Sequence, residues 1–295
     1  MKKNILKIYF IDFWSHFNKK DNYFYHLLST KYTVIVTDNN PDLLFISSFH
    51  RSSDDINDPK YDSSKKIFYT GEDQYPSSEI YDATFTFKET GDKNYRLPLW
   101  VLHLNWFNVP LKNNRDISYH GDLQGFLLKD RKFKKNKFCS FVSSKETPER
   151  VDFVNALSEF QYIDCPGDVL NNHKKLRGRG DQKYKRNFLK KYKFNISFEN
   201  TYSDGYVTEK IIQPMFVNTL PIYWGTKEVK NDFNPKSFIY VNDFATKEHA
   251  IEHISNVYSN EDLYSEILSE PWFHGNEIPE RFKPKNILGF LENIL

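Results

Sequence analysis

The chain lacks the features that mark membrane-spanning and disulfide-bonded proteins. Its 295 residues include two cysteines, Cys139 and Cys165, and neither has a partner at metal-ligand spacing. Each lies in an apolar stretch, which indicates a small core residue in a reducing compartment. No run approaches the roughly 18 apolar residues that a spanning helix requires, so we expect no transmembrane segment. Peripheral attachment to a membrane stays open.

Neither sign of charge is in excess. The sequence has 41 Lys and Arg against 39 Asp and Glu, a net charge of +2. This balance gives no global argument for a nucleic-acid or membrane partner, so any anion site must be local. Alanine is scarce, whereas 26 Phe and 19 Tyr predict cores built on aromatic side chains.

The first half of the chain reads as short apolar strands separated by polar turns. The predicted strands cover residues 7–13, 33–37, 43–47, 66–70 and 83–87. Strands that are apolar at every position are covered on both faces, which indicates a mostly parallel sheet between helices. We therefore expect an α/β fold.

A cationic stretch, KDRKFKKNK at 129–137, is typical of a linker between domains. After it, strands and helices alternate again, as in a second doubly wound domain. The elements expected there are strands at 138–142, 163, 194–198, 220–224 and 238–241, with helices at 148–160, from 209, and at 247–258. The predicted domains are residues 1–130 and 131–275, with the C-terminal helix, 276–295, packing back on the first.

The most informative segment is FENTYSDGYVTEKIIQPMFVNTLPIYWG, residues 198–225. It leaves a strand, turns at Gly205 and enters a helix capped by Thr208, in which Pro214 should kink or shorten the helix. Such a helix start exposes backbone N–H groups at the carboxyl edge of a sheet, where doubly wound domains bind anions. Lys210 adds a full charge, and Glu209 can accept hydrogen bonds from paired hydroxyls such as those of a ribose.

FEN, GYVTEK and LPIYWG closely resemble the donor-binding motif of the α-1,3/1,4-fucosyltransferases, the bacterial branch in particular. FYTGE at 68–72 is similar to that family's acceptor-side motif, and CSFVSS with Arg150 to its phosphate-binding strand and helix. YKFNISFEN at 192–200 and DFNPKSFIYVNDF at 232–244 also match. Several motifs in the right order, over most of residues 65–245, are far more specific than any one alone.

The resemblance implies two facing Rossmann-like domains in the GT-B architecture, with the acceptor bound by the first and GDP-fucose by the second. Carried over onto the matching positions, it makes Glu72 the general base. The donor-binding residues that it implies are Arg150, Asn200, Tyr206, Glu209 and Lys210.

The resemblance also assigns roles within the donor site. Arg150 and Lys210 would hold the phosphates, Asn200 and Tyr206 would contact the donor, and Glu209 would bind ribose or fucose. In the implied inverting reaction, the base removes a proton from a hydroxyl of a GlcNAc-containing acceptor, similar to N-acetyllactosamine, as its oxygen attacks C1 of L-fucose. We expect no cofactor and no metal, because two cations and a helix start can take a divalent ion's place and no Asp-X-Asp occupies the expected strand edge.

Other functions remain as alternatives. The chain could be a GT-B transferase that uses another nucleotide sugar, or a non-catalytic glycan-binding protein. The basic and aromatic stretch KYKRNFLKKYK, 183–193, allows a nucleic-acid role, but Tyr184, Phe188 and Tyr192 at helical spacing favour one apolar stripe on an amphipathic helix. A glycosidase would need a second carboxylate facing Glu72, and the sequence offers no evident one.

The family's animal members carry a membrane anchor before the catalytic region, and this chain has no such segment. This comparison predicts a bacterial or viral enzyme that works from the cytoplasm, with contact at the inner membrane face left open. The sequence makes no prediction about the linkage position, O3 or O4, or about the oligomeric state.

Overall fold

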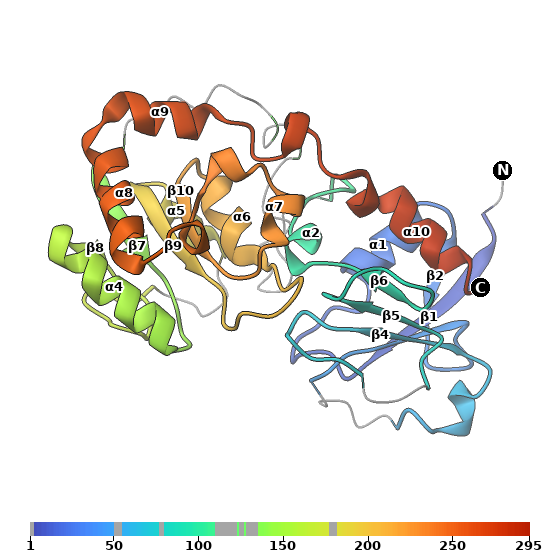
Figure 1. Ribbon diagram of the computed structural model, residues 1–295. Helices are drawn as coiled ribbons and strands as arrows, with labels where there is room; N and C mark the ends of the chain where they lie inside the picture. Colours follow the sequence, from blue (N-terminus) through green and yellow to red (C-terminus); the bar gives the residue numbers. More distant parts are fainter. Residues whose placement is uncertain are drawn as a thin grey trace. The chain divides into compact units, whose positions relative to one another are not determined.

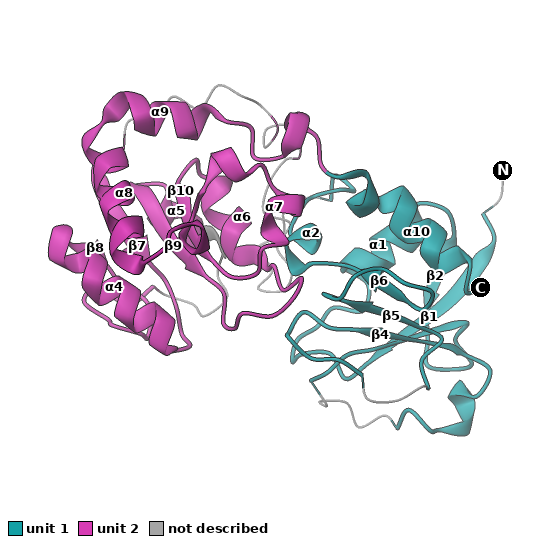
Figure 2. Ribbon diagram, viewed as in Figure 1, with its two compact units in different colours: residues 1–119, 279–295 teal, residues 120–278 magenta. Residues whose placement is uncertain are grey.

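The computed structural model describes residues 3–49, 55–76, 80–109, 123, 127, 135–176 and 182–295. The chain divides into two compact units, residues 1–119 with 279–295 and residues 120–278 (Figure 2). Most of the predicted linker lies outside the described residues. Its last residues belong to the second unit, because Lys135 is buried there.

The first unit contains a six-stranded, wholly parallel sheet in the order β2-β1-β3-β4-β5-β6 (Figure 1). Its strands are β1 (Ile5–Ile11), β2 (Thr33–Val36), β3 (Leu43–Ile46), β4 (Lys65–Tyr69), β5 (Ala83–Thr86) and β6 (Asn94–Arg96). All four side chains of β3 are buried, as expected for a strand covered on both faces. The sequence analysis missed β6, whose three residues are polar or aromatic and show no apolar pattern.

Helices from both ends of the chain cover this sheet. They are α1 (Tyr23–Ser29), α2 (Leu99–Leu102) and α10 (Pro284–Glu292), with short 3₁₀ turns at Pro59–Tyr61 and Glu280–Phe282. Helix α10 lies beside α1 (Figure 1), and the Tyr32 hydroxyl donates to Glu292 Oε1 at 2.9 Å. The Phe290 ring also packs against Phe85 of β5. The last turns of the chain are therefore part of the first unit.

The second unit contains a five-stranded parallel sheet in the order β11-β10-β9-β7-β8. Its strands are β7 (Lys137–Phe141), β8 (Ile163–Asp164), β9 (Tyr192–Phe198), β10 (Leu220–Trp224) and β11 (Ile239–Tyr240). Its helices are α4 (Pro148–Phe160), α5 (Gln182–Leu189), α6 (Glu209–Met215), α7 (Val229–Asp232), α8 (Lys247–Ser259) and α9 (Glu261–Ser269). The two parallel sheets confirm the predicted α/β fold.

In each sheet the strand order reverses beside the first strand, so that later strands are added on its other side. In the second unit, β7 lies between β8 on one side and β9 on the other. In the first unit, β1 likewise lies between β2 and β3. Ligands of doubly wound sheets bind at the carboxyl ends of the strands that flank such a point. The topology therefore indicates one crevice at β7 and β9, and one at β1 and β3.

One sequence prediction in the second unit is wrong. Helix α5 ends at Leu189, so Tyr192 belongs to β9 and not to a helical stripe. Tyr184 is 51% exposed, whereas Phe188, Leu189 and Tyr192 form one buried cluster. The turn between α5 and β9 lets the cluster form across two elements, which helical spacing alone did not anticipate.

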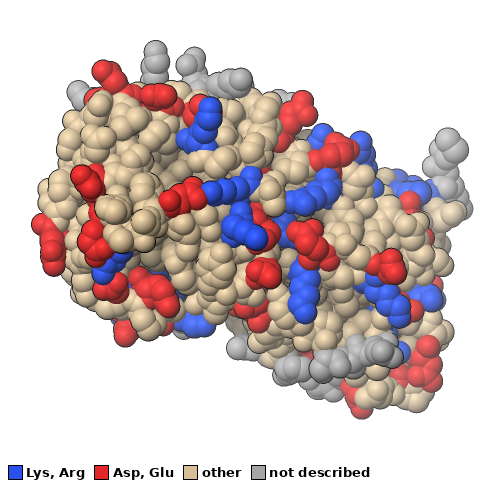
Figure 3. All heavy atoms as spheres, viewed as in Figure 1, with Lys and Arg blue, Asp and Glu red and all other residues tan. Residues whose placement is uncertain are grey.

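Acidic and basic side chains both occur across the face shown in Figure 3, in line with the small net charge. Among the described residues, no helix combines the length and the apolar character needed to cross a bilayer.

Lys135 connects three segments of the second unit. Its ammonium donates to Lys190 O at 2.8 Å, Val217 O at 2.9 Å and Thr219 Oγ1 at 3.0 Å, and the side chain is buried. The three donors of an ammonium are thus matched by three acceptors.

We predict that Lys135→Met lowers the free energy of unfolding by about 1–3 kcal/mol, because it leaves buried carbonyls without donors. Urea denaturation of the two proteins measures the difference. Lys190→Met, which removes an exposed side chain nearby, should change the midpoint little. Equal stability of wild type and Lys135→Met would contradict this account.

Candidate active site

A buried carboxylate organises the connection between β9 and α6. Glu199 follows β9 directly and its side chain is fully buried. It accepts hydrogen bonds from Thr208 N at 2.8 Å, Thr208 Oγ1 at 2.7 Å and the Tyr223 hydroxyl at 3.2 Å. Lys210 Nζ lies 3.2 Å from Glu199 Oε2. Because a buried charge is costly unless it is paired, these contacts hold the intervening turn in one conformation.

The sequence analysis did not assign a role to Glu199. The signal was present, since an acid directly after a buried strand must either reach solvent or find buried partners. The consequence is a correction at the start of α6. The N–H of Thr208 donates to Glu199, and the N–H of Lys210 donates to Thr208 Oγ1. These two N–H groups are therefore already bonded and do not bind an anion.

Helix α6 itself is short. It is capped by Thr208, as predicted, and ends at Met215 with Pro214 in its last turn. The turn before it contains Gly205 at φ 74°, a left-handed conformation that favours glycine. Because the helix has seven residues and the N–H groups of Thr208 and Lys210 have acceptors, it contributes charge to the site mainly through its side chains.

Lys210 carries the positive charge of that helix start. Its Nζ lies 3.0 Å from Thr208 Oγ1, 3.2 Å from Glu199 and 3.9 Å from Glu209 Oε1. Burial acts to lower the pKa of Lys210, but the carboxylates of Glu199 and Glu209 outweigh it and hold the pKa above its usual value. The side chain is 21% exposed, so a protonated lysine reaches the surface at the carboxyl edge of the sheet.

Arg150 joins the loops that follow β7 and β9. It lies in the first turn of α4 and is 1% exposed. Its Nη1 donates to Ser143 Oγ at 3.0 Å and Lys145 O at 2.7 Å, while Nη2 donates to Phe198 O at 2.5 Å and Asn200 Oδ1 at 2.8 Å. The guanidinium therefore lies at the point where the sheet reverses direction.

Arg150 is both desolvated and incompletely bonded. Burial lowers its pKa, and the charges of Glu199, Tyr206 and Glu209 oppose that shift. Its buried Nε has no hydrogen-bond partner within the described part of the chain. Since a buried unsatisfied N–H costs about 1–3 kcal/mol, a bound acceptor at this atom would be favoured.

The structure brings together the five predicted donor-binding residues in the second unit. Arg150 contacts Asn200 directly, and Glu209 lies next to Lys210. Tyr206 is buried close enough to Arg150 to influence its pKa.

Glu72 lies in the first unit, three residues after β4 ends. Its backbone is held by Thr70, whose Oγ1 accepts from Glu72 N at 3.0 Å and donates to Glu72 O at 2.9 Å. The side chain is exposed. Strand β4 is the neighbour of β3, so Glu72 lies at the carboxyl edge of the sheet, one strand from the crevice of this unit.

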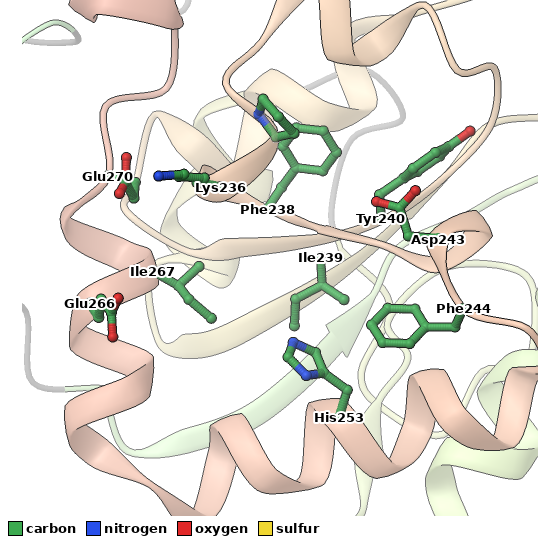
Figure 4. A pocket seen from close by; sticks show the side chains of 11 residues that line it. Lys236, Phe238, Ile239, Tyr240, Asp243, Phe244, His253, Glu266, Ile267 and Glu270 are labelled. Carbon is green, nitrogen blue, oxygen red and sulfur yellow. The ribbon is translucent and has the colours of Figure 1, made fainter.

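A separate cavity of about 340 Å³ lies between β11, α8 and α9 (Figure 4). The His253 and Phe244 rings lie side by side in it, with centroids 5.1 Å apart. Glu266, Glu270 and Lys236 lie toward its other end (Figure 4). None of the predicted site residues lines this cavity.

Two protein-family models match the chain. The model of the C-terminal part of glycosyltransferase family 10 (fucosyltransferase) matches residues 131–278, half of the chain. The chain belongs to glycosyltransferase family 10. The model of the α-(1,3)-fucosyltransferase FucT N-terminal domain matches residues 8–103 of this family 10 chain. Both matches confirm the resemblance stated from the motifs.

Curated relatives agree with this family. The α-(1,3)-fucosyltransferase FucT of Helicobacter pylori is 32% identical over 94% of this chain and 62% of that protein. A putative fucosyltransferase of Acanthamoeba polyphaga mimivirus is 35% identical over 46% of this chain and 24% of that protein. The chain thus spans less than two thirds of these relatives.

Solved structures give the same result. The crystal structure of an α1,3-fucosyltransferase with GDP-fucose is 29% identical, with a TM-score of 0.75 over 100% of this chain and 91% of that one. The crystal structure with GDP is 30% identical, with a TM-score of 0.75 over 99% and 90% of the two chains. The family 10 chain therefore has the GT-B fold that its motifs predicted.

We predict that Glu199→Gln lowers the free energy of unfolding by about 2–3 kcal/mol, because it removes a buried charge that binds Thr208, Tyr223 and Lys210. Chemical denaturation measures the effect. Glu149→Gln, an exposed carboxylate in the first turn of α4, serves as control and should stay within about 0.5 kcal/mol of wild type. If both variants unfold at the wild-type midpoint, Glu199 does not organise the turn.

Proposed function

We propose that this chain is an inverting α-1,3-fucosyltransferase that moves L-fucose from GDP-fucose to a hydroxyl of a GlcNAc-containing glycan. The observation that carries the proposal is the pair of cations, Arg150 and Lys210, at the carboxyl ends of β7 and β9. Membership of family 10 supports it, as do relatives named α-(1,3)-fucosyltransferases and related structures titled with GDP-fucose and with GDP.

The second unit supplies the donor site in this proposal. When the bond between fucose and the β-phosphate breaks, negative charge gathers on the departing GDP. The Lys210 ammonium and the Arg150 Nε–H are cationic donors held in place before the reaction, so they stabilise that charge without reorganising. Fixed donors of this kind typically contribute a factor of about 10² to 10³ each in rate.

The remaining residues orient the donor. Arg150 fixes the oxygen of Asn200, which leaves the Asn200 amide nitrogen to donate to a sugar or phosphate oxygen. Glu209, partly exposed beside Lys210, accepts hydrogen bonds from ribose or fucose hydroxyls. We assign to Tyr206 a contact with the donor from its place near Arg150.

The first unit supplies the acceptor site and the base. The Glu72 carboxylate removes the proton from the acceptor hydroxyl as that oxygen attacks C1 of fucose, while the C1–phosphate bond breaks on the opposite face. One new bond replaces one old bond, the proton passes to Glu72, and the configuration at C1 inverts. Positioned bases typically contribute about 10² to 10⁴ in rate.

We predict that Glu72→Gln lowers kcat by about 10² to 10⁴ and leaves GDP affinity unchanged, because an amide cannot take the proton but the donor site is intact. GDP release from GDP-fucose with N-acetyllactosamine measures turnover, and calorimetry measures GDP binding. Asp92→Asn, an exposed carboxylate of the same unit, should keep wild-type turnover. Full activity in Glu72→Gln would rule out this base.

We predict that Arg150→Lys weakens GDP binding at least about tenfold, because one ammonium cannot replace the four bonds that hold the loops after β7 and β9. Calorimetry against GDP, UDP and CMP provides the measurement and also tests the nucleotide. A wild-type preference for UDP would favour the alternative of another nucleotide sugar, and GDP binding without turnover on any glycan would favour a binding protein.

A further inference from the structure

A third cation adjoins the proposed donor site. Lys185 lies on α5, in the basic and aromatic stretch that the sequence analysis interpreted as an amphipathic helix. Helix α5 packs against α6 and β9. The Lys185 ammonium donates to Gln213 Oε1 of α6 at 2.5 Å, and its side chain is partly buried.

The contact with Gln213 places the Lys185 ammonium on the side of α6 that carries Glu209, a residue of the proposed donor site. Gln213 follows Glu209 by four residues, so the two side chains lie on the same side of the helix, one turn apart. Gln213 is buried, which fixes the position of the amide that holds Lys185. The ammonium therefore lies along the side of α6 from which Glu209 projects.

Charges from three elements act on Lys185. They are Glu209 and Lys210 on α6, Arg150 on α4 and Glu199 at the end of β9. With Lys185 included, this cluster has three cations and two carboxylates, so one positive charge is left over. Glu199 is already paired with Lys210, and Glu209 lies 3.9 Å from the same ammonium. Within the described residues, the bond of Lys185 is to a neutral amide.

We propose that Lys185 is a further donor-binding residue, whose ammonium binds a phosphate oxygen of the nucleotide diphosphate. This inference rests on the proposed function. A partly buried cation beside two others, bonded within the described residues to a neutral amide, is poorly placed in the unliganded protein. An incoming diphosphate, which carries more than one negative charge, compensates for it.

The protonation of Lys185 gives the proposal a measurable signature. Burial lowers the pKa of Lys185 to about 8, assisted by Lys210 and Arg150 and opposed by Glu209 and Glu199. A bound anion favours the charged form and raises that pKa. Above pH 8 the unliganded protein has lost part of this proton, so binding must take it up and affinity falls as pH rises. Well below pH 8, Lys185 is protonated in both states and contributes no pH dependence.

The test is calorimetry of the full chain with GDP at pH 7.0 and pH 8.8, in buffers of different ionisation enthalpy. We expect wild type to lose about fivefold in affinity between these values and to take up protons at pH 8.8. Lys185→Gln should bind GDP about tenfold or more weakly at pH 7.0. Lys185→Arg keeps its charge at both pH values, so it should bind within about threefold of wild type without the extra proton uptake.

The controls separate the explanations. Lys190→Gln, an exposed lysine just after α5, should match wild type in affinity and proton uptake. Titration of the nucleotide itself is common to all variants, so the comparison with Lys185→Arg removes it. If Lys185→Gln keeps wild-type affinity and proton uptake while its melting temperature falls, Lys185 is a structural link between α5 and α6 and the proposal is wrong. If wild type itself binds no GDP, the proposed function fails first, and this inference with it.

Discussion

The ion pair between Glu199 and Lys210 is the interaction on which the rest of the site depends. A fully buried carboxylate is tolerated only with several partners, and those partners are the cap of α6, a tyrosine of β10 and the ammonium of Lys210. The same charge that closes the turn also keeps Lys210 protonated and oriented. Stability of the turn and charge of the site therefore have one physical origin.

Arg150 adds a second set of bonds to the site, at the point between β7 and β9 where the strand order of the sheet reverses. From the first turn of α4 its guanidinium donates to Lys145 O in the loop after β7 and to Phe198 O and Asn200 Oδ1 at the end of β9, so two segments far apart in sequence share one guanidinium. Side chains from three elements therefore hold the site. Arg150 of α4 binds Asn200, while Thr208 at the start of α6 and Tyr223 of β10 bind Glu199. Fixed cations are what a departing diphosphate requires, since charge stabilisation is most effective where no groups must move. In our proposal Lys185 of α5 adds a third cation to Arg150 and Lys210.

Local sequence patterns anticipated most of the strands because parallel strands covered on both faces are largely apolar. Helix α4 begins and ends where the sequence placed it, at 148 and 160. Predictions weakened where elements are short or polar, as in β6, and where a helix gives way to a strand, as at Tyr192. Periodicity describes one element at a time, so it does not predict a buried cluster that is formed by residues of two elements.

The sequence by itself determined the α/β class, the place of most strands, the family motifs and the residue types of the proposed donor site. These follow from local spacing and from motif order along the chain. Only the tertiary structure decided that Glu199 is buried, that Arg150 reaches Asn200 fifty residues away, and that Lys185 meets Gln213 on α6. Such contacts depend on how side chains from separate elements pack and exclude water, and no local pattern encodes that packing.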